Sequence, residues 1–277
     1  MAKDGNGNVV LFGGYVCCHD VNETWLWDGT NWRQASPATS PPGQEFSSMA
    51  ADKNNKLVLY GGTSFLNQTW LWDGTNWTQA TPRTSPPARA FAAMAADKNH
   101  DVVLFGGATN YTLTKLLNDT WLWDGQTWRK WASATGIAPS GRIGASMTID
   151  KNGNLVLFGG GVNFFSGTCF NDTWLWTGRG WKRASPTTSP PARNFATMAT
   201  DQNGNVILFG GQSCSTALLD DTWLWNGTTW TQLSPATSPP ARQFASSATD
   251  KNGNIALYGG FTPGQGGFYD DTWLFSP

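Results

Sequence analysis

The chain has 277 residues, of which only 13% are charged, and its formal net charge is -1. A surface with so little charge and no basic excess lacks the electrostatic footprint that attracts nucleic acid or an anionic membrane. No stretch approaches the roughly 18 consecutive apolar residues that cross a bilayer, so we expect neither nucleic-acid partners nor membrane insertion.

The amino-acid composition gives an indication of the protein's location. The chain holds 17 Trp against 2 His, with few Lys and abundant Thr, Ser, Asn and Gly. This composition is more typical of secreted β-rich proteins than of cytosolic enzymes. We therefore expect an extracellular or secreted protein, although the N-terminus lacks the charged-then-apolar layout of a signal peptide.

The first elements in chain order are short strands. Residues 9–12 are apolar and end at Gly13-Gly14, which predicts a strand buried on both faces. Residues 24–27, Thr-Trp-Leu-Trp, predict a second strand, and the Asp-Gly turn at 28–29 leads into a third strand that begins at Trp32. A segment such as 89–97 supplies a fourth strand.

These elements recur in one order six times, at intervals of about 45 to 53 residues. The Gly-Gly pairs mark the register: Gly13-Gly14, Gly61-Gly62, Gly106-Gly107, Gly159-Gly160, Gly210-Gly211 and Gly259-Gly260. The predicted repeats are approximately 1–43, 44–88, 89–141, 142–192, 193–241 and 242–277.

Four short strands per repeat, with Gly-Gly and Trp at fixed offsets, resemble the Kelch-repeat family over nearly the whole chain. The resemblance implies an all-β protein, a six-bladed Kelch-type β-propeller with four-stranded antiparallel blades around a central channel. Residues 1–277 would then form a single propeller domain.

The first and last blades are predicted to be incomplete. Met1-Ala2-Lys3-Asp4 aligns with Met198-Ala199-Thr200-Asp201, inside an inner strand, and residues 272–277 finish after a third strand. Three alternatives remain: an open seam, completion by another chain, or an excerpt of a longer protein. Unpaired strand edges at an open seam would favour self-association.

One position at the start of the inner strand is rich in arginine. It is occupied by Gln44, Arg89, Arg142, Arg193 and Arg242. The Kelch resemblance places this position near the channel mouth, where four guanidinium groups would form a ring that binds carboxylate or phosphate. The alternative is that each Arg braces its own Pro-rich loop or pairs with a nearby acid.

The loops after the Gly-Gly pairs differ from repeat to repeat, and variable loops on a constant scaffold often carry binding sites. They hold aromatic residues that the repeat does not require: Tyr15, Phe65, Tyr111, Phe164, Phe165, Phe268 and Tyr269. These residues predict a binding rim for a protein or glycan, with capping of the blades as the alternative.

The four cysteines lie in the same loops. Cys169 and Cys214 belong to neighbouring blades and are the predicted disulfide, provided that their Cα atoms come within about 7 Å. Cys17 and Cys18 could form a vicinal disulfide, a metal pair or free thiols. No zinc set of four ligands is visible, so no metal or other cofactor is expected.

The sequence gives little evidence for a set of catalytic residues. Galactose oxidase-like Kelch proteins hold copper with two His and Tyr ligands, whereas His19 and His100 lie in different repeats. We predict a non-enzymatic binding module that presents its loops and an Arg-lined channel mouth to a protein, glycan or acidic ligand. The alternatives are a self-assembling repeat protein closed by strand exchange and a sugar-modifying enzyme of the mutarotase-like type, for which Glu45 is the nearest acid/base group.

Overall fold

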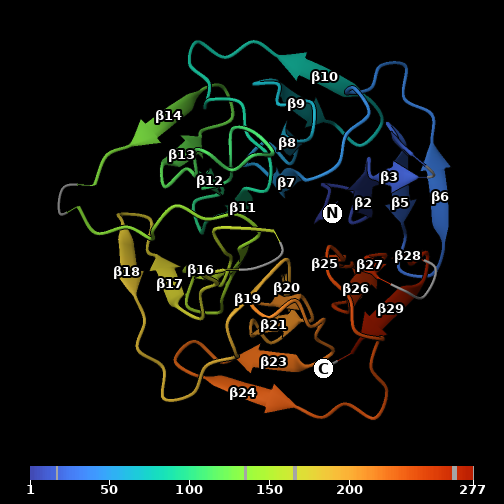
Figure 1. The fold of residues 1–277 in the computed structure, drawn as a ribbon. Coiled ribbons are helices and arrows are strands. Elements are labelled where there is room, and N and C mark those ends of the chain that lie inside the picture. The colour runs from blue at the N-terminus through green and yellow to red at the C-terminus, as the bar shows by residue number, and fades with distance from the viewer. Residues whose placement is uncertain (17, 134–135, 165–166, 264–266, 277) are drawn as a thin grey trace.

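A computed structural model describes residues 1–16, 18–133, 136–164, 167–263 and 267–276. Every regular element in these ranges is a β-strand. The six sheets of three or four strands are arranged radially around one axis (Figure 1), so the predicted six-bladed β-propeller is confirmed. Across the described ranges, no helix has both the length and the apolar character needed to cross a bilayer.

The strands of each blade are antiparallel and follow one another from the axis to the rim. Blade 1 contains β1 (Ala2–Lys3), β2 (Val9–Phe12), β5 (Thr24–Trp27) and β6 (Trp32–Ala35). Blade 2 contains β7 (Ser47–Ala51), β8 (Leu57–Gly61), β9 (Thr69–Trp72) and β10 (Trp77–Ala80). Blade 3 contains β11 (Ala93–Ala96), β12 (Val102–Phe105), β13 (Thr120–Trp123) and β14 (Trp128–Trp131).

The second half of the ring repeats this order. Blade 4 contains β15 (Ser146–Ile149), β16 (Leu155–Phe158), β17 (Thr173–Trp176) and β18 (Trp181–Arg183). Blade 5 contains β20 (Thr197–Thr200), β21 (Val206–Phe209), β23 (Thr222–Trp225) and β24 (Trp230–Leu233). Blade 6 contains β25 (Ser246–Thr249), β26 (Ile255–Tyr258) and β29 (Thr272–Phe275). Blade 1 therefore has a short inner strand and blade 6 has three strands, as predicted.

The ring closes between blades 6 and 1 through non-covalent contacts. Strand β1 contacts both β25 and β7, so it occupies the innermost position between blades 6 and 2. At the rim, the indole Nε1 of Trp32 donates a hydrogen bond to Oγ1 of Thr272 at 2.9 Å. The seam that the sequence left open is thus bridged at the axis and at the rim.

The hydrophobic core lies between adjacent blades. The second and third strands of a blade are apolar on both faces because each face packs against a neighbouring blade. Trp77 of blade 2 is an example: its ring lies 5.2 Å from Phe12 of blade 1, and its Nε1 donates to Oγ1 of Thr24 at 2.9 Å. The repeated tryptophans are therefore packing residues of the scaffold.

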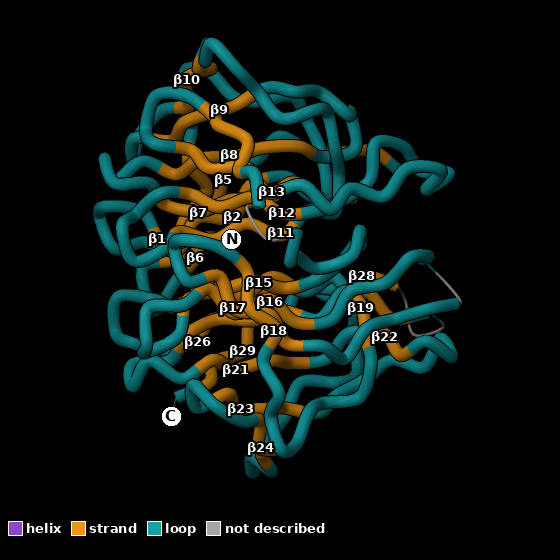
Figure 2. Tube along the Cα trace, turned by 90° about the vertical axis from the view of Figure 1, so that its left-hand side faces the viewer, coloured by secondary structure: helices purple, strands orange, loops and turns teal. Residues whose placement is uncertain are grey.

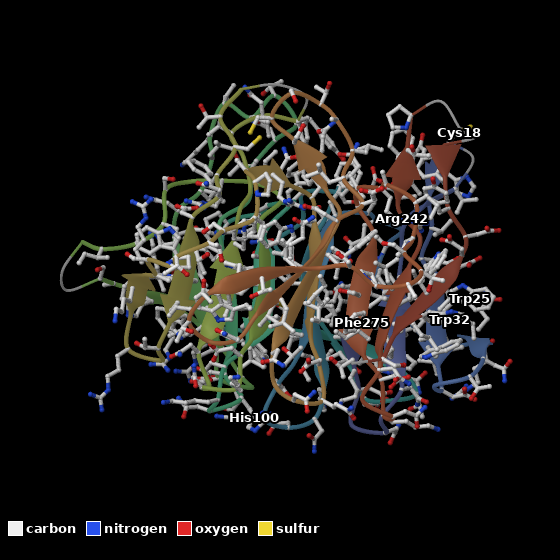
Figure 3. The ribbon with its side chains drawn as sticks, turned by 90° about the horizontal axis from the view of Figure 1, so that it is seen from below. Cys18, Trp25, Trp32, His100, Arg242 and Phe275 are labelled. Atoms are coloured by element: carbon white, nitrogen blue, oxygen red, sulfur yellow. The ribbon has the colours of Figure 1, made fainter. Side chains whose placement is uncertain are left out.

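The propeller has two different faces. On one, the loops after the Gly-Gly pairs form the short pairs β3 (Tyr15–Val16) with β4 (His19–Asp20) and β27 (Phe261–Thr262) with β28 (Gly267–Phe268). There β22 (Gln212–Ser213) also pairs with β19 (Arg193–Asn194), which precedes the inner strand of blade 5. We call this the loop face; β19, β22 and β28 project from it in Figure 2. His100 lies at the opposite end of the molecule from Cys18 (Figure 3).

Tight turns form that opposite face. Asp150 is typical, because its Oδ1 accepts hydrogen bonds from the backbone N–H groups of Asn152 at 2.9 Å and Asn154 at 3.0 Å. A buried carboxylate that closes its own turn explains the recurring Asp-x-Asn-Gly pattern.

Candidate functional site

Gly-Gly corners tie each blade to the next one and lead into the loop face. Gly159 and Gly160 have φ values of 70° and 88°, and Gly160 N–H donates to the backbone oxygen of Arg193 at 2.8 Å. A Cβ atom at Gly159 would lie 2.6 Å from the same oxygen. Glycine is therefore required here by both its backbone conformation and the close approach of the next blade.

The arginine that follows each corner is enclosed within the protein. The Arg193 side chain is 0% exposed, and its Nη1 and Nη2 donate to the two carboxylate oxygens of Asp221 at 2.5 and 2.8 Å. Nη1 also donates to the Gly210 oxygen at 3.0 Å, and Nε donates to the Pro191 oxygen at 3.1 Å. The guanidinium donors are thus engaged inside the blade.

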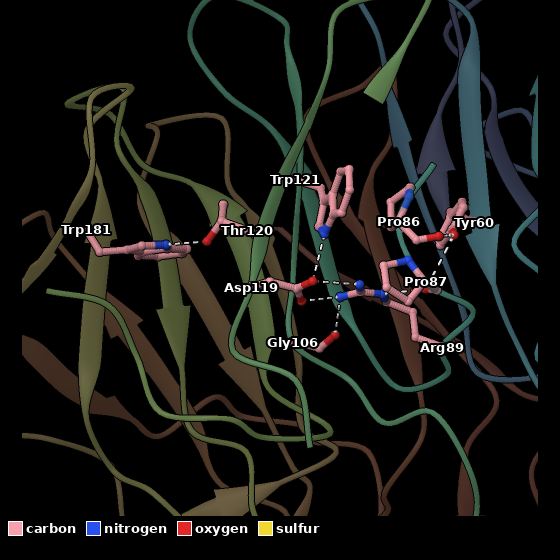
Figure 4. A network of polar contacts seen from close by, with 9 residues as sticks. All are labelled: Tyr60, Pro86, Pro87, Arg89, Gly106, Asp119, Thr120, Trp121 and Trp181. Carbon is pink, nitrogen blue, oxygen red and sulfur yellow. Dashed lines mark hydrogen bonds and ion pairs between the residues drawn. The ribbon is translucent and has the colours of Figure 1, made fainter. Parts of the chain in front are cut away.

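The other three arginines have the same surroundings. Their bidentate partners are Asp119 for Arg89, Asp172 for Arg142 and Asp271 for Arg242. Figure 4 shows the network of Arg89, Asp119 and Gly106. These contacts correct the expectation of an exposed arginine ring: the side chains brace the start of each inner strand and face their own acids rather than the channel.

Electrostatics keep these pairs ionised. Burial acts to raise the pKa of Asp221, but the hydrogen bonds from Arg193 and Trp223 and the charge of Arg193 outweigh it, so this pKa lies below its usual range. In blade 2 the position is occupied by buried Gln44, and Gln68 stands where blades 3 to 6 have Asp. Pairing with a nearby acid, the alternative stated for these arginines, is therefore confirmed. The sequence also shows which acid it is, because Asp precedes the Thr-Trp-Leu strand wherever Arg begins the inner strand.

Four phenylalanines cover the channel on the loop face and form what we call the aromatic floor: Phe46, Phe91, Phe195 and Phe244. Their ring centroids lie 4.3 Å apart for Phe46 and Phe91, and 4.4 Å apart for Phe195 and Phe244. All four have φ between 55° and 62°. This uncommon conformation for a bulky residue aims the rings toward one another.

A belt of backbone hydrogen bonds fixes the aromatic floor. Phe91 N–H donates to the Phe46 oxygen, Gly144 to Phe91, Phe195 to Gly144, and Phe244 to Phe195, at 2.8 to 3.1 Å. These residues were not among those predicted, although a Phe recurs two positions after Gln44, Arg89, Arg193 and Arg242. Beneath them lies a channel cavity of about 180 Å³ lined by Ser, Thr, Ala and Met residues.

Three of the predicted rim residues extend the aromatic floor. Phe65 and Tyr111 meet edge to face with centroids 5.0 Å apart, and Phe164 lies 5.0 Å from Phe91. The side chain of Tyr111 is the most accessible of the three, at 49% exposure. Phe165 lies outside the described residues.

The remaining rim residues lie near the junction of blades 6 and 1. Tyr15 and Phe268 have ring centroids 5.9 Å apart, and both are exposed. Tyr269 instead lies under the Arg242 guanidinium, whose Cζ is 3.8 Å from the ring centroid. Tyr269 therefore supports the ion pair of Arg242 with Asp271, whereas Tyr15 and Phe268 form a separate exposed aromatic pair.

Acidic groups lie beside the aromatic floor. Thr63 Oγ1 donates to Oδ2 of Asp20 at 2.5 Å and accepts from the backbone N–H of Glu45 at 3.2 Å. Burial, followed by repulsion from Asp20, raises the pKa of Glu45 to about 7. Asp20 and Glu45, the ionisable side chains next to Phe46, thus accept hydrogen bonds when charged. They attract cations or hydrogen-bond donors.

A family model described as the KLHDC2/KLHL20/DRC7 Kelch-repeats domain matches residues 1–177 and 124–277, which together span the chain. The chain belongs to this Kelch-repeat family. A solved structure titled "Structure of YjhT" superposes on this Kelch propeller with a TM-score of 0.72. It covers 92% of this chain and 88% of that chain at 15% sequence identity, a likeness of fold alone. No match is found among curated proteins.

Cysteines of the Kelch propeller lie at the loop face. Cys169 and Cys214 are half-buried free thiols that contact each other; burial and the Cys214 thiol raise the pKa of Cys169. The contact between blades 4 and 5 agrees with the predicted pairing, and the disulfide itself stays a prediction. Cys18 is an exposed free thiol, and Cys17 lies outside the described residues.

Proposed function

We propose that this Kelch propeller is a non-enzymatic binding module that holds a protein ligand on its loop face. Kelch propellers generally serve as binding and interaction modules. The observation that carries the proposal is the aromatic floor with its accessible extension at Tyr111. Aromatic clusters on a rigid scaffold are typical of the energetic centre of protein interfaces.

The chemistry of the site favours one kind of ligand. Asp20 and Glu45 supply acceptors beside Phe46, while the guanidinium donors of the neighbouring repeats are already paired with Asp. An acidic ligand would find carboxylates rather than cations here. We therefore propose a polypeptide that places an apolar or aromatic side chain on the aromatic floor and a Lys or Arg beside Glu45.

A displayed peptide library selected on the 277-residue chain tests this proposal. We expect the selected peptides to combine an aromatic residue with Lys or Arg, and Tyr111→Ala to weaken their binding about 10-fold or more in biolayer interferometry. Phe268→Ala is the matched control, since it removes an exposed aromatic residue of the other pair, and it should leave binding unchanged. Selection of peptides that bind both variants equally would contradict the assignment to the aromatic floor.

A second candidate, sugar modification, is favoured by one observation. Glu45, with its pKa raised to about 7, would exist in both protonation states near neutral pH, as general acid/base catalysis requires. Exchange between the anomers of sialic acid, followed by NMR, would show acceleration by the chain and its loss in Glu45→Gln. Unchanged exchange would remove this candidate.

A further inference from the structure

The outer strands of blades 3 and 4 carry more positive charge than those of blades 1, 2 and 5. After the first Trp, the next two residues are Arg129-Lys130 in β14 and Lys182-Arg183 in β18. The same positions hold Thr-Gln in β10 and β24, and Arg-Gln in β6. All four cationic side chains of blades 3 and 4 are exposed. Two neighbouring blades therefore depart from the repeat in the same direction (Figure 1).

The turn that leads into β18 has the same bias. Its first residue is Thr177, where blades 1 to 3 have Asp and blade 5 has Asn. Its third residue is the exposed Arg179, where those four blades have Thr or Gln. Relative to blades 1 to 3, the turn of blade 4 has therefore lost an acid and gained a base.

Trp131 lies at the junction of these two blades. It ends β14, whereas β6 and β10 end in Ala and β24 ends in Leu. Its ring meets that of Trp176 in blade 4 edge to face, with centroids 5.0 Å apart. A Cβ atom built on Gly180 would lie 3.1 Å from Cζ2 of Trp131. The half-buried indole is thus next to the turn that carries Arg179.

Strand alternation directs two further arginines to this junction. Arg129 is two residues, or about 7 Å, from Trp131 and shares its face of β14. Arg183 shares the face of Trp181 in β18, and Trp181 Nε1 donates to Thr120 of blade 3 at 2.9 Å. We call the four side chains at this junction the rim cluster: Arg129, Trp131, Arg179 and Arg183.

Acidic side chains offset only part of this positive charge. Arg129 lies 3.4 Å from Asp101. The carboxylate nearest in sequence to the turn of blade 4, that of Asp172, is already paired with Arg142 at 2.6 Å. Among the described residues, Arg179 forms no salt bridge. The rim cluster is therefore a local cationic site in a chain whose formal net charge is -1.

Protection of exposed strand edges does not account for this pattern. Charged residues on an edge strand do discourage pairing with other chains. However, β10 and β24 are also the outermost strands of their blades, and they carry Thr and Gln. Edge protection also requires no Trp at the end of β14. Binding of a ligand accounts for both the cations and the aromatic ring.

We propose that the rim cluster binds an acidic polysaccharide, a chain of sugar rings that bear carboxylate groups. Guanidinium groups donate paired hydrogen bonds to carboxylates, and the indole of Trp131 offers a flat apolar surface for the face of a sugar ring. An acidic polypeptide would satisfy the arginines but would not need the flat ring among them. The site lies on the outside of the propeller, apart from the aromatic floor, and does not depend on the proposed loop-face function.

Biolayer interferometry of the 277-residue chain on immobilised oligogalacturonate tests this proposal. We expect saturable binding that weakens as the NaCl concentration rises, and no capture by neutral dextran. Lys182→Thr/Arg183→Gln copies the outer strand of blade 5, and Trp131→Ala copies that of blade 2, so the scaffold should tolerate both. Each variant should bind about 10-fold or more weakly. Arg33→Thr, at the equivalent position of blade 1, is the matched control and should bind unchanged.

Melting temperatures of the same variants separate a loss of binding from a loss of folding, and we expect them to stay close to that of the native chain. Absence of saturable binding by the native chain would overturn the proposal, as would equal binding by the native chain and Trp131→Ala. Equally tight binding of poly-L-glutamate would assign the rim cluster to acidic polypeptides instead. Tyr111→Ala, which tests the loop-face proposal, should bind oligogalacturonate like the native chain.

Discussion

Blades 2 and 5 place different side chains at the same buried position. The backbone oxygens of Gln44 and Arg193 both accept a hydrogen bond from the second glycine of the preceding blade, at 2.9 and 2.8 Å. Only Arg193 adds a bidentate ion pair. The comparison teaches that the constant role of this position is to join blades through the backbone. The guanidinium is a local brace that appears where an Asp can receive it.

Removing one partner of the ion pair should have the largest effect. Arg193→Met leaves Asp221 without its cation, and breaking a buried pair in this way costs about 3–5 kcal/mol in the free energy of unfolding. Gln44→Met in blade 2 leaves no charge behind and should cost about 1 kcal/mol. Urea unfolding measures both values; equal losses would mean that the charge contributes nothing beyond packing.

Placing the neutral glutamine pair of blade 2 in blade 5 should recover most of the free energy of unfolding that Arg193→Met loses. The double variant Arg193→Gln/Asp221→Gln reproduces the neutral Gln44 and Gln68 pattern and buries no unpaired charge. We expect it to remain within about 1–2 kcal/mol of the native chain. A double-mutant cycle with the two single variants gives the coupling energy, and strictly additive losses would contradict an interacting pair.

Acid should expose the same difference between blades. The pKa of Asp221 is lowered from its ordinary value of 3.8, so the stability it contributes is fully present above about pH 4 and is lost as pH falls through the lower folded value. The native chain should therefore lose more thermal stability between pH 5 and pH 2 than the Arg193→Gln/Asp221→Gln variant. Parallel melting temperatures of the two proteins across this range would refute the linkage.

Glu45, next to Gln44, should respond in the opposite direction. Its pKa is raised from 4.5 to about 7, so folding favours the protonated form, and stability falls as pH rises from about 4.5 to 7. Glu45→Gln should raise the melting temperature at pH 8 and change little at pH 4. A variant that is destabilised equally at both pH values would instead indicate a structural role.

The smallest effect is expected for an ion pair on the surface. Arg129 lies 3.4 Å from Asp101, and its side chain is 61% exposed. Exposed pairs contribute about 0–1 kcal/mol, so Arg129→Ala should change the free energy of unfolding by no more than that. Comparing its loss in the free energy of unfolding with that of Arg193→Met shows how much the burial of an ion pair, rather than charge pairing alone, determines that loss.

Much of the scaffold was predictable because its signals are local. Apolar runs such as Val9–Phe12, the Gly-Gly corners and the Asp-Gly turns each act within a few residues, and they set the strands and their order within a blade. The surroundings of the arginines were harder to predict. The Asp partner of Arg193 lies 28 positions further along the chain, and the exposure of a side chain cannot be read from its residue type.

By itself, the sequence determined six repeats, an all-β class, incomplete terminal blades and the Kelch pattern, since each depends on patterns that recur within about 50 residues. Tertiary structure alone decided which side chains meet when the ring closes. Trp32 contacts Thr272 across 240 positions of the chain, Phe46 and Phe244 come within 5.1 Å over the axis, and the arginines are enclosed within the blades. These contacts depend on the curvature of the whole ring, which no single repeat contains.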